Sequence, residues 1–297
     1  MLAYHRVGAR SAAKFNASVY TADAGQLDRH IRYFKQHCRL VDLEEALALA
    51  AGRERAKGTA VLLTFDDGYL DNYETAFPVL RAHRASAVFF LVSSFVEGNA
   101  LPWWDQISGA VKAAPVKRFS LPAPGGSEAV FNLTGDRDTA AEAVLDFFKA
   151  SRQSPESFLR VLSERCECAP PQAGAERIFL SWGQAREMQA AGMSIGGHTH
   201  THPILATLHE AQQRTEIESS KQILERELGQ RVEAMAYPVG GPADFDAATV
   251  RAASACGYRA AFSCHGGLNT PGNTQLFDIK RIPLYWDANP EWLLDPE

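Results

Sequence analysis

Two short stretches of the chain carry residue types that could do hydrolytic chemistry. In the first, V-L-L-T-F-D-D-G-Y at residues 61–69, an apolar run leads into Asp66, Asp67 and Gly68. Such a run is typical of a strand buried on both faces, and in parallel α/β barrels the carboxyl ends of strands carry the chemistry. Because successive strand side chains point to opposite sides, we expect different roles for the two aspartates. One would bind a metal and the other would act as a base.

The second stretch, S-I-G-G-H-T-H-T-H-P at residues 194–203, places three histidines within five residues. In an extended or turning loop, His198 and His202 would lie on one side. Two neutral imidazoles and one carboxylate leave the fourth position of Zn²⁺ open to water, as in hydrolytic zinc sites. Asp67 is the expected third ligand. Each stretch alone has a plainer explanation, an Asp-Gly turn or a surface histidine cluster, but together they favour a metal site.

Strands and helices alternate along the chain in the pattern of parallel α/β proteins. Apolar runs predict strands at residues 2–7, 61–65, 87–92, 178–182, 193–198, 232–237, 260–263 and 278–284. Helical periodicity predicts helices between them, at residues 24–38, 73–83, 183–191, 210–228 and 245–257. This alternation predicts a (β/α) barrel of seven or eight parallel strands.

A long segment interrupts this alternation. Residues 97–177 combine Pro- and Gly-rich stretches with helical segments. We interpret them as a largely helical insertion that covers one end of the barrel, within a single catalytic domain spanning residues 1–297. Trp103 and Trp104 open the insertion. They are either anchors of a hydrophobic core or, in particular Trp104, a platform for a sugar ring.

Composition excludes some classes of protein. The formal net charge of -5 over 297 residues, without a Lys/Arg block, argues against nucleic-acid binding. Apolar runs are too short for a transmembrane helix. The N-terminus reads as a strand rather than a signal peptide, and the five scattered cysteines suggest free thiols in a reducing compartment. A cytoplasmic location is therefore expected, although a secreted protein trimmed of its leader would look the same.

The two motifs together carry a family resemblance. T-F-D-D-G at 64–68 followed by H-T-x-T-H-P at 198–203 resembles the polysaccharide deacetylase family, carbohydrate esterase family 4 with the NodB homology domain. The resemblance implies a distorted (β/α) barrel, a divalent metal (Zn²⁺ first, Co²⁺ or Ni²⁺ next), and removal of N-acetyl groups from amino sugars. It makes Asp66 the catalytic base and Asp67, His198 and His202 the metal ligands, with His200 on a variable position between them.

Other family motifs are altered. Where well-known members carry Arg-x-Pro-Tyr, this chain has A-Y-P-V-G at 236–240, so the arginine that orients the base is missing there. That form, with an early Tyr-His and a late Arg-Ile-Pro, is similar to the branch acting on poly-N-acetylglucosamine and other exopolysaccharides. Tyr237 and Pro238 are thus candidate substrate-binding residues, and the Tyr237 amide is a candidate oxyanion donor. Arg281 either supplies the missing charge near Asp66 or forms a structural salt bridge.

The general acid and the bond cleaved remain open from the sequence. His265, at a strand end, is the first candidate acid, and His5 is the second; His5 could equally be a structural histidine or line the substrate pocket. The expected partner is an N-acetylated carbohydrate. Two alternatives stay open: an imidase-like C–N hydrolase acting on a small cyclic amide, and a non-catalytic carbohydrate-binding relative.

Overall fold

The computed structural model describes residues 1–292 except 56, 99 and 124, and its chain forms two compact units. The first comprises Met1–Ala9, Tyr20–Gly98 and Arg177–Glu297, and the second comprises Arg10–Val19 and Asn99–Glu176. The insertion expected at residues 97–177 falls on the second unit, which also takes in Arg10–Val19. That the whole chain is one catalytic domain stays a prediction.

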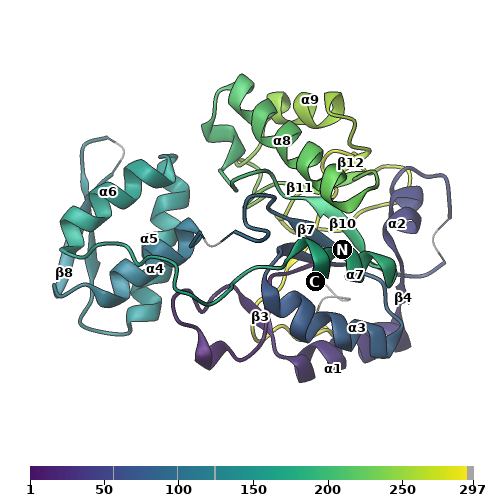
Figure 1. Ribbon diagram of the computed structural model, residues 1–297, viewed down its shortest axis with the longest axis horizontal. Coiled ribbons are helices and arrows are strands. Elements are labelled where there is room, and N and C mark those ends of the chain that lie inside the picture. The colour runs from purple at the N-terminus through teal and green to yellow at the C-terminus, as the bar shows by residue number, and fades with distance from the viewer. Residues whose placement is uncertain (56, 99, 124, 293–297) are drawn as a thin grey trace. The chain divides into compact units, whose positions relative to one another are not determined.

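A seven-stranded parallel sheet forms the centre of the first unit (Figure 1), in the order β12-β11-β10-β7-β6-β1-β13. This confirms the distorted (β/α) barrel, with seven strands. Residues 178–182 were expected to form a strand of this sheet, but they do not. Phe179 forms only an isolated antiparallel bridge with Tyr69. The strands of the sheet are β1 (Leu2–Tyr4), β6 (Leu63–Asp67), β7 (Val88–Leu91), β10 (Ser194–Gly197), β11 (Ala234–Ala236), β12 (Ala260–Phe262) and β13 (Ile282–Pro283).

Two further parallel pairs lie outside this sheet, β2 (Arg6–Val7) with β3 (Tyr20–Ala22), and β4 (Arg39–Leu40) with β5 (Ala60–Val61). The strand expected at residues 2–7 is thus divided at His5. The helices of the unit are α1 (Ala24–His37), α2 (Leu43–Ala50), α3 (Phe77–His83), α7 (Trp182–Ala190), α8 (Glu210–Leu228) and α9 (Ala247–Ala255), with a π-helical turn η2 (Asn72–Ala76) and a 3-10 turn η3 (Leu205–Thr207).

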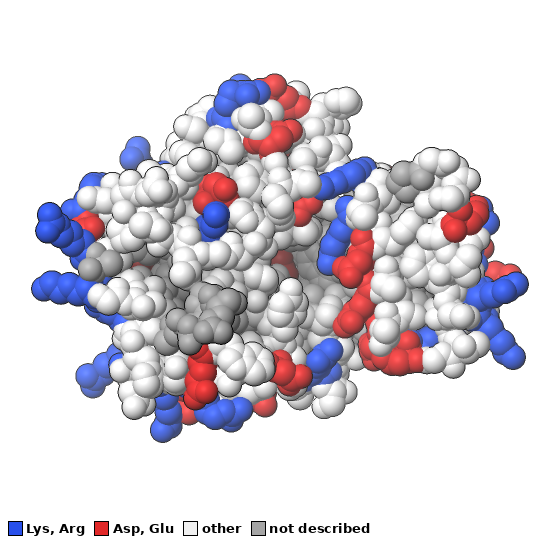
Figure 2. Space-filling model, turned by 180° about the vertical axis from the view of Figure 1, so that it is seen from behind, with Lys and Arg blue, Asp and Glu red and all other residues white. Residues whose placement is uncertain are grey.

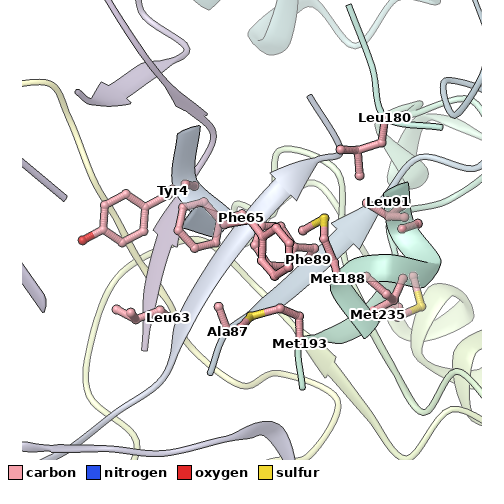
Figure 3. Close-up of a cluster of buried hydrophobic side chains, with 14 of the residues drawn as sticks. Tyr4, Leu63, Phe65, Ala87, Phe89, Leu91, Leu180, Met188, Met193 and Met235 are labelled. Carbon is pink, nitrogen blue, oxygen red and sulfur yellow. The ribbon is translucent and has the colours of Figure 1, made fainter. Parts of the chain in front are cut away.

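Stacked aromatic rings hold the central strands in register (Figure 3). Tyr4 of β1 stacks on Phe65 of β6 with ring centroids 5.0 Å apart, and Phe65 stacks on Phe89 of β7 at 4.9 Å. All three rings are fully buried, on the face that packs against Leu27 of α1 and other helical residues. Because side chains alternate along a strand, this packing of Phe65 directs Asp66 to the opposite face of the sheet.

The segment around β13 joins the two edges of the curled sheet. β13 pairs with β1, and Ile279, three residues earlier, forms a parallel bridge with Phe262 of β12. Close strand packing elsewhere depends on glycine: a Cβ at Gly196 of β10 would lie 2.4 Å from the Phe90 ring. The carboxyl ends of β1, β6, β10, β11 and β12 therefore meet around one space at the end of the barrel.

The second unit consists of α4 (Trp103–Ala113), α5 (Arg137–Ser151), α6 (Pro155–Cys166), an antiparallel hairpin of β8 (Arg118–Pro122) and β9 (Glu128–Asn132), and a 3-10 turn η1 (Arg10–Ala12). Trp103 and Trp104 are only 7% and 5% exposed, and their rings meet edge to face. Trp103 also packs on Phe148 of α5. The two tryptophans are core anchors, and burial leaves Trp104 too little free surface to serve as the sugar platform.

The surface carries no dominant charge on the face drawn in Figure 2. Acidic and basic side chains are dispersed there among residues of other kinds, which cover most of the view. None of the described helices combines the length and apolar character needed to cross a membrane.

Candidate active site

The end of β6 brings both neighbouring aspartates towards the same place. Asp67 has a φ of 72°, and the Gly68 amide donates to the Asp66 carbonyl, 3.0 Å away. This i to i+2 bond around a residue of positive φ marks the rarer, strained form of the γ-turn. The turn ends the strand alternation, so Asp66 and Asp67 both lie within 4 Å of the His198 Nε2, at 3.9 and 3.6 Å.

The loop after β10 presents the two imidazoles. The Nδ1 of His198 lies 2.8 Å from the Ala236 carbonyl oxygen, which can only accept, so Nδ1 carries the proton and Nε2 presents its lone pair. Glu216 of α8 holds the loop from the other side, because its carboxylate accepts from the backbone amides of His200 and Thr201 at 2.9 and 2.8 Å. His202 follows with a φ of 61°.

Asp67, His198 and His202 form a buried cluster whose ligand atoms all lie within 4.8 Å of one another. Asp67 Oδ1 is 3.6 Å from His198 Nε2 and 3.4 Å from His202 Nε2. Ligand bonds of about 2.0–2.2 Å in a tetrahedral zinc site place ligand atoms about 3.3 Å apart. The separations of the Asp67 oxygen from the two imidazole nitrogens are therefore close to those that a divalent ion of this kind requires.

Burial keeps both imidazoles in the form that binds metals. It lowers the pKa of His198 to about 4, against the opposing effect of Asp66. Burial also places the pKa of His202 well below its ordinary value, and the neighbouring His198 lowers it further. Both rings are therefore neutral near pH 7, as metal coordination requires.

Arg281 meets Asp66 in a two-pronged ion pair, with Nη1 to Oδ1 at 2.7 Å and Nη2 to Oδ2 at 2.9 Å. The guanidinium is fully buried, and it also donates to the Ser263 carbonyl and the Thr64 hydroxyl at 3.1 and 3.0 Å. Burial by itself would raise the pKa of Asp66, but Arg281 and then His198 outweigh it and hold that pKa at about 2. Asp66 is thus ionised and oriented.

His5 lies at the same end of the barrel. Tyr4 pairs with Phe65, so the next residues along the two parallel strands, His5 and Asp66, are at the same level. Burial, the largest effect, raises the pKa of Asp66 and lowers the pKa values of His198 and His202, and His5 makes a smaller contribution that lowers all three. His5, the second candidate for the general acid, is therefore close enough to the metal cluster to influence its charges.

His265, the first-ranked candidate acid, has a different neighbour. Its Nε2 lies 3.1 Å from the Oδ1 of Asp278. The charges with the largest effects on the pKa values of Asp66, His198 and His202 include His5 but not His265. Asp278 is thus the described contact of the His265 ring, and the choice between His265 and His5 as the general acid stays a prediction.

Tyr237 and Pro238 are buried after β11. The ring of Tyr237 stacks on Phe245, and its hydroxyl donates to the Phe277 carbonyl at 2.9 Å. Its amide already donates to the Phe262 carbonyl at 3.0 Å, so the prediction that this N–H stabilises an oxyanion is wrong. Pro238 begins a second strained γ-turn: the Gly240 amide donates to its carbonyl across Val239, whose φ is 62°.

Sequence reasoning missed two residues that hold the chain around His5. Asn72, fully buried at the start of η2, donates from Nδ2 to the His5 carbonyl at 2.7 Å. Asp71 accepts from the Val7 amide at 3.0 Å and from Nε of Arg6 at 2.7 Å. Their place five and six residues after Asp66, at the start of a predicted helix, was the available signal, since polar residues there often bond to nearby backbone.

A parallel barrel with two aspartates and two neutral imidazoles converging at its strand ends has the architecture of a metal-assisted hydrolase. Comparison with known protein families identifies which class of hydrolase this is. The family described as polysaccharide deacetylase matches residues 53–119 and 126–261, which is more than half of the chain. The chain belongs to the polysaccharide deacetylase family.

Individual relatives are distant. "Putative polysaccharide deacetylase YxkH" of Bacillus subtilis (strain 168) is 21% identical over 216 residues, covering 73% of this chain and 48% of YxkH. The matched region is therefore about half the length of that curated relative. Streptococcus pyogenes deacetylase PplD, solved in complex with acetate, has 20% identity and a TM-score of 0.64 over 99% of this chain and 95% of PplD. IcaB from Ammonifex degensii has 20% identity and a TM-score of 0.61, over 98% and 92%. These structures establish the shared fold.

Proposed function

We propose that this protein is a metal-dependent hydrolase that removes N-acetyl groups from a glycan containing amino sugars and releases acetate. One observation carries the proposal: Asp67, His198 and His202 hold their ligand atoms at separations that suit a tetrahedral ion, directly beside an aspartate fixed by Arg281. Zn²⁺ is the proposed ion, with Co²⁺ and Ni²⁺ as replacements, since imidazole and carboxylate ligands suit all three.

A divalent ion in this position supplies Lewis-acid polarisation of the acetamide carbonyl and acidifies the attacking water. Side chains of the protein carry out the remaining steps. Asp66 accepts a proton from that water as the water adds to the carbonyl carbon. Arg281 fixes the orientation of the Asp66 carboxylate with two hydrogen bonds and keeps it ionised before the reaction.

The proton for the leaving amine comes from His5 in this proposal. His5 is at the level of Asp66 on the adjacent strand, and its backbone is held by Asn72 and by Thr21, whose Oγ1 accepts from the His5 amide at 3.2 Å. A histidine is suited to the task, because its ordinary pKa lies close to neutral pH. Protonation of the nitrogen allows the C–N bond to break, giving acetate and a free amino sugar.

Metal content and acetate release test the proposal together. Wild-type protein, Asp66→Asn, His198→Ala and His200→Ala would be loaded with Zn²⁺, desalted and assayed on oligomers of N-acetylglucosamine. We expect near-stoichiometric zinc in all but His198→Ala. Acetate release should fall by about 10²–10⁴-fold in Asp66→Asn, the range for loss of general acid–base catalysis.

His200→Ala is the matched control within the same motif. The His200 ring contacts the Ser93 hydroxyl at 2.9 Å rather than the metal cluster, so its loss should leave both zinc content and turnover near wild type. Full activity in Asp66→Asn would refute the assignment of the base. A wild-type protein that takes up no metal would refute the hydrolase itself.

A further inference from the structure

One exposed aromatic side chain, Tyr285, lies two residues after the end of β13. Leu284 is buried at 3% exposure, whereas the next residue, Tyr285, is 71% exposed. A tyrosine ring carries a large apolar face that is usually covered by protein, so a ring left open at a strand end can accept a ligand.

Strand register places Tyr285 at the level of the catalytic residues. β13 pairs with β1 through Leu2 with Ile282 and Ala3 with Pro283, and the Leu284 amide still donates to the Ala3 carbonyl at 3.0 Å. Two residues further along each strand, Tyr285 is opposite His5. His5 in turn is level with Asp66 on β6.

The alternation of side chains along β13 and the residues after it indicates on which face of the sheet Tyr285 lies. Arg281 reaches Asp66 across the inner face of the sheet, whereas Leu284 packs in the hydrophobic cluster on the other face. Tyr285 follows Leu284 and is exposed, so it lies on the same side as Arg281 and Asp66. Adjacent strands are about 4.8 Å apart, and the backbone of Tyr285 is therefore about 10 Å from that of Asp66, two strands away.

Partly buried hydrogen bonds fix the backbone that follows the ring. The Trp286 carbonyl accepts from Nε2 of Gln26 at 2.9 Å, and the Ala288 carbonyl accepts from Nε2 of His30 at 3.1 Å. His30 itself is 3% exposed and accepts the Tyr4 hydroxyl proton on Nδ1 at 3.0 Å. The segment is thus tied to α1 and, through Tyr4, to β1, while its tyrosine ring stays open to solvent.

We propose that Tyr285 is a sugar-binding platform, on which a pyranose ring of the glycan stacks beside the residue that is being deacetylated. This inference rests on the proposed function. A ligand that contacts both Tyr285 and the metal cluster must extend well beyond one acetyl group, as a chain of sugar rings does. The apolar C–H face of such a ring packs on the tyrosine face, and the pre-organised segment limits the entropy lost on binding.

The test is a kinetic comparison of wild type with Tyr285→Ala, Tyr285→Leu and Tyr285→Phe on a tetramer of N-acetylglucosamine. We expect KM to rise about tenfold in the Ala and Leu variants, which corresponds to loss of one good aromatic contact, with kcat within about twofold of wild type. The Phe variant, which keeps the ring, should restore the wild-type KM. An unchanged KM in Tyr285→Ala, or a Phe variant as weak as the Ala variant, would overturn the platform.

A binding titration separates this inference from the proposed function. A wild-type protein that releases no acetate from the tetramer contradicts the function, and calorimetric titration of the same tetramer into zinc-loaded protein then decides the platform alone. Binding about tenfold weaker in Tyr285→Ala than in wild type supports it. Equal binding by the two proteins, or no binding by wild type, refutes it.

Discussion

Replacement of Arg281 by methionine should strongly destabilise the protein and reverse the pH dependence that Asp66 contributes to its stability. Arg281 is fully buried and makes two hydrogen bonds to Asp66, of 2.7 and 2.9 Å. Methionine fills much of the same space without a charge. The substitution therefore leaves the Asp66 carboxylate buried without its counter-ion, and breaking a buried pair in this way costs about 3–5 kcal/mol.

The pKa of Asp66 gives an independent estimate of the interaction. Burial raises this pKa, but Arg281 and His198 lower it more, from its ordinary value of 3.8 to about 2. A difference of that size between the unfolded and folded states corresponds to about 2 kcal/mol of stability. It is smaller than the cost of the substitution because the intact pair already offsets the desolvation of both groups.

The sign of the pH effect follows from proton uptake. In metal-free wild type, the folded pKa lies below the unfolded one, so this contribution is present above about pH 4 and is lost as the pH falls through about 2. In Arg281→Met the dominant effect of burial should raise the folded pKa of Asp66 above 3.8, so the folded state keeps the proton. Stability of the variant should then fall as pH rises above 4, the opposite slope.

Urea unfolding in EDTA at pH 3 to 8, followed by tryptophan fluorescence, measures both effects. Arg259→Met is the control: this arginine, on the surface, pairs with Glu44 at 2.8 Å and also with Glu233, and its loss should cost at most about 1 kcal/mol. Adding Asp66→Asn to Arg281→Met should recover part of the loss, since no unpaired charge remains. The reasoning fails if Arg281→Met costs no more than Arg259→Met, or if the double variant is less stable than the single one.

Three further predictions concern the acid, the metal and the strained turn. His5→Gln should lower acetate release by about 10²–10⁴-fold with zinc retained, whereas His265→Gln should stay within about threefold; the reverse ranking would return the acid role to His265. Zinc at 100 times its dissociation constant should stabilise wild type by about 2.7 kcal/mol against chemical unfolding, and His198→Ala by far less, so equal shifts would place the ion elsewhere. Val239→Gly should raise the free energy of unfolding by about 1 kcal/mol, because glycine adopts the positive φ without strain. A lower free energy of unfolding in urea than that of wild type would contradict this.

Much of the fold and the metal cluster was predictable, because both follow from local patterns. Apolar runs located the strands, and parallel strands bring their carboxyl ends together. The residues of the cluster come directly after two such runs, so Asp67 and His198 needed no further information to be placed near each other. Residues 178–182 show the limit: the side chains of Phe179, Leu180 and Trp182 are buried, but the backbone makes only one bridge, which composition does not reveal.

The partners of these residues were harder to predict, because they depend on pairing between distant segments. Arg281 was a candidate for the missing charge, but a pairing across 215 residues follows from the position of β13 beside β1, not from any local pattern. The choice between His5 and His265 also required the register of β1 with β6. The Tyr237 amide failed as a donor for the same reason, since its hydrogen bond belongs to the neighbouring β12.

Backbone strain explains why two adjacent aspartates can serve one centre. In a regular strand their side chains would point to opposite faces, yet both reach the Nε2 of His198 within 4 Å, at 3.9 and 3.6 Å. The change of direction comes from the left-handed φ of Asp67, and Thr199 and His202 adopt the same region in the facing loop. Such conformations cost about 1–3 kcal/mol each and persist only where the surroundings impose them. Here the buried strands β6 and β10 impose them, so an ideal barrel backbone with the same residues would separate the proposed base from the proposed metal ligand.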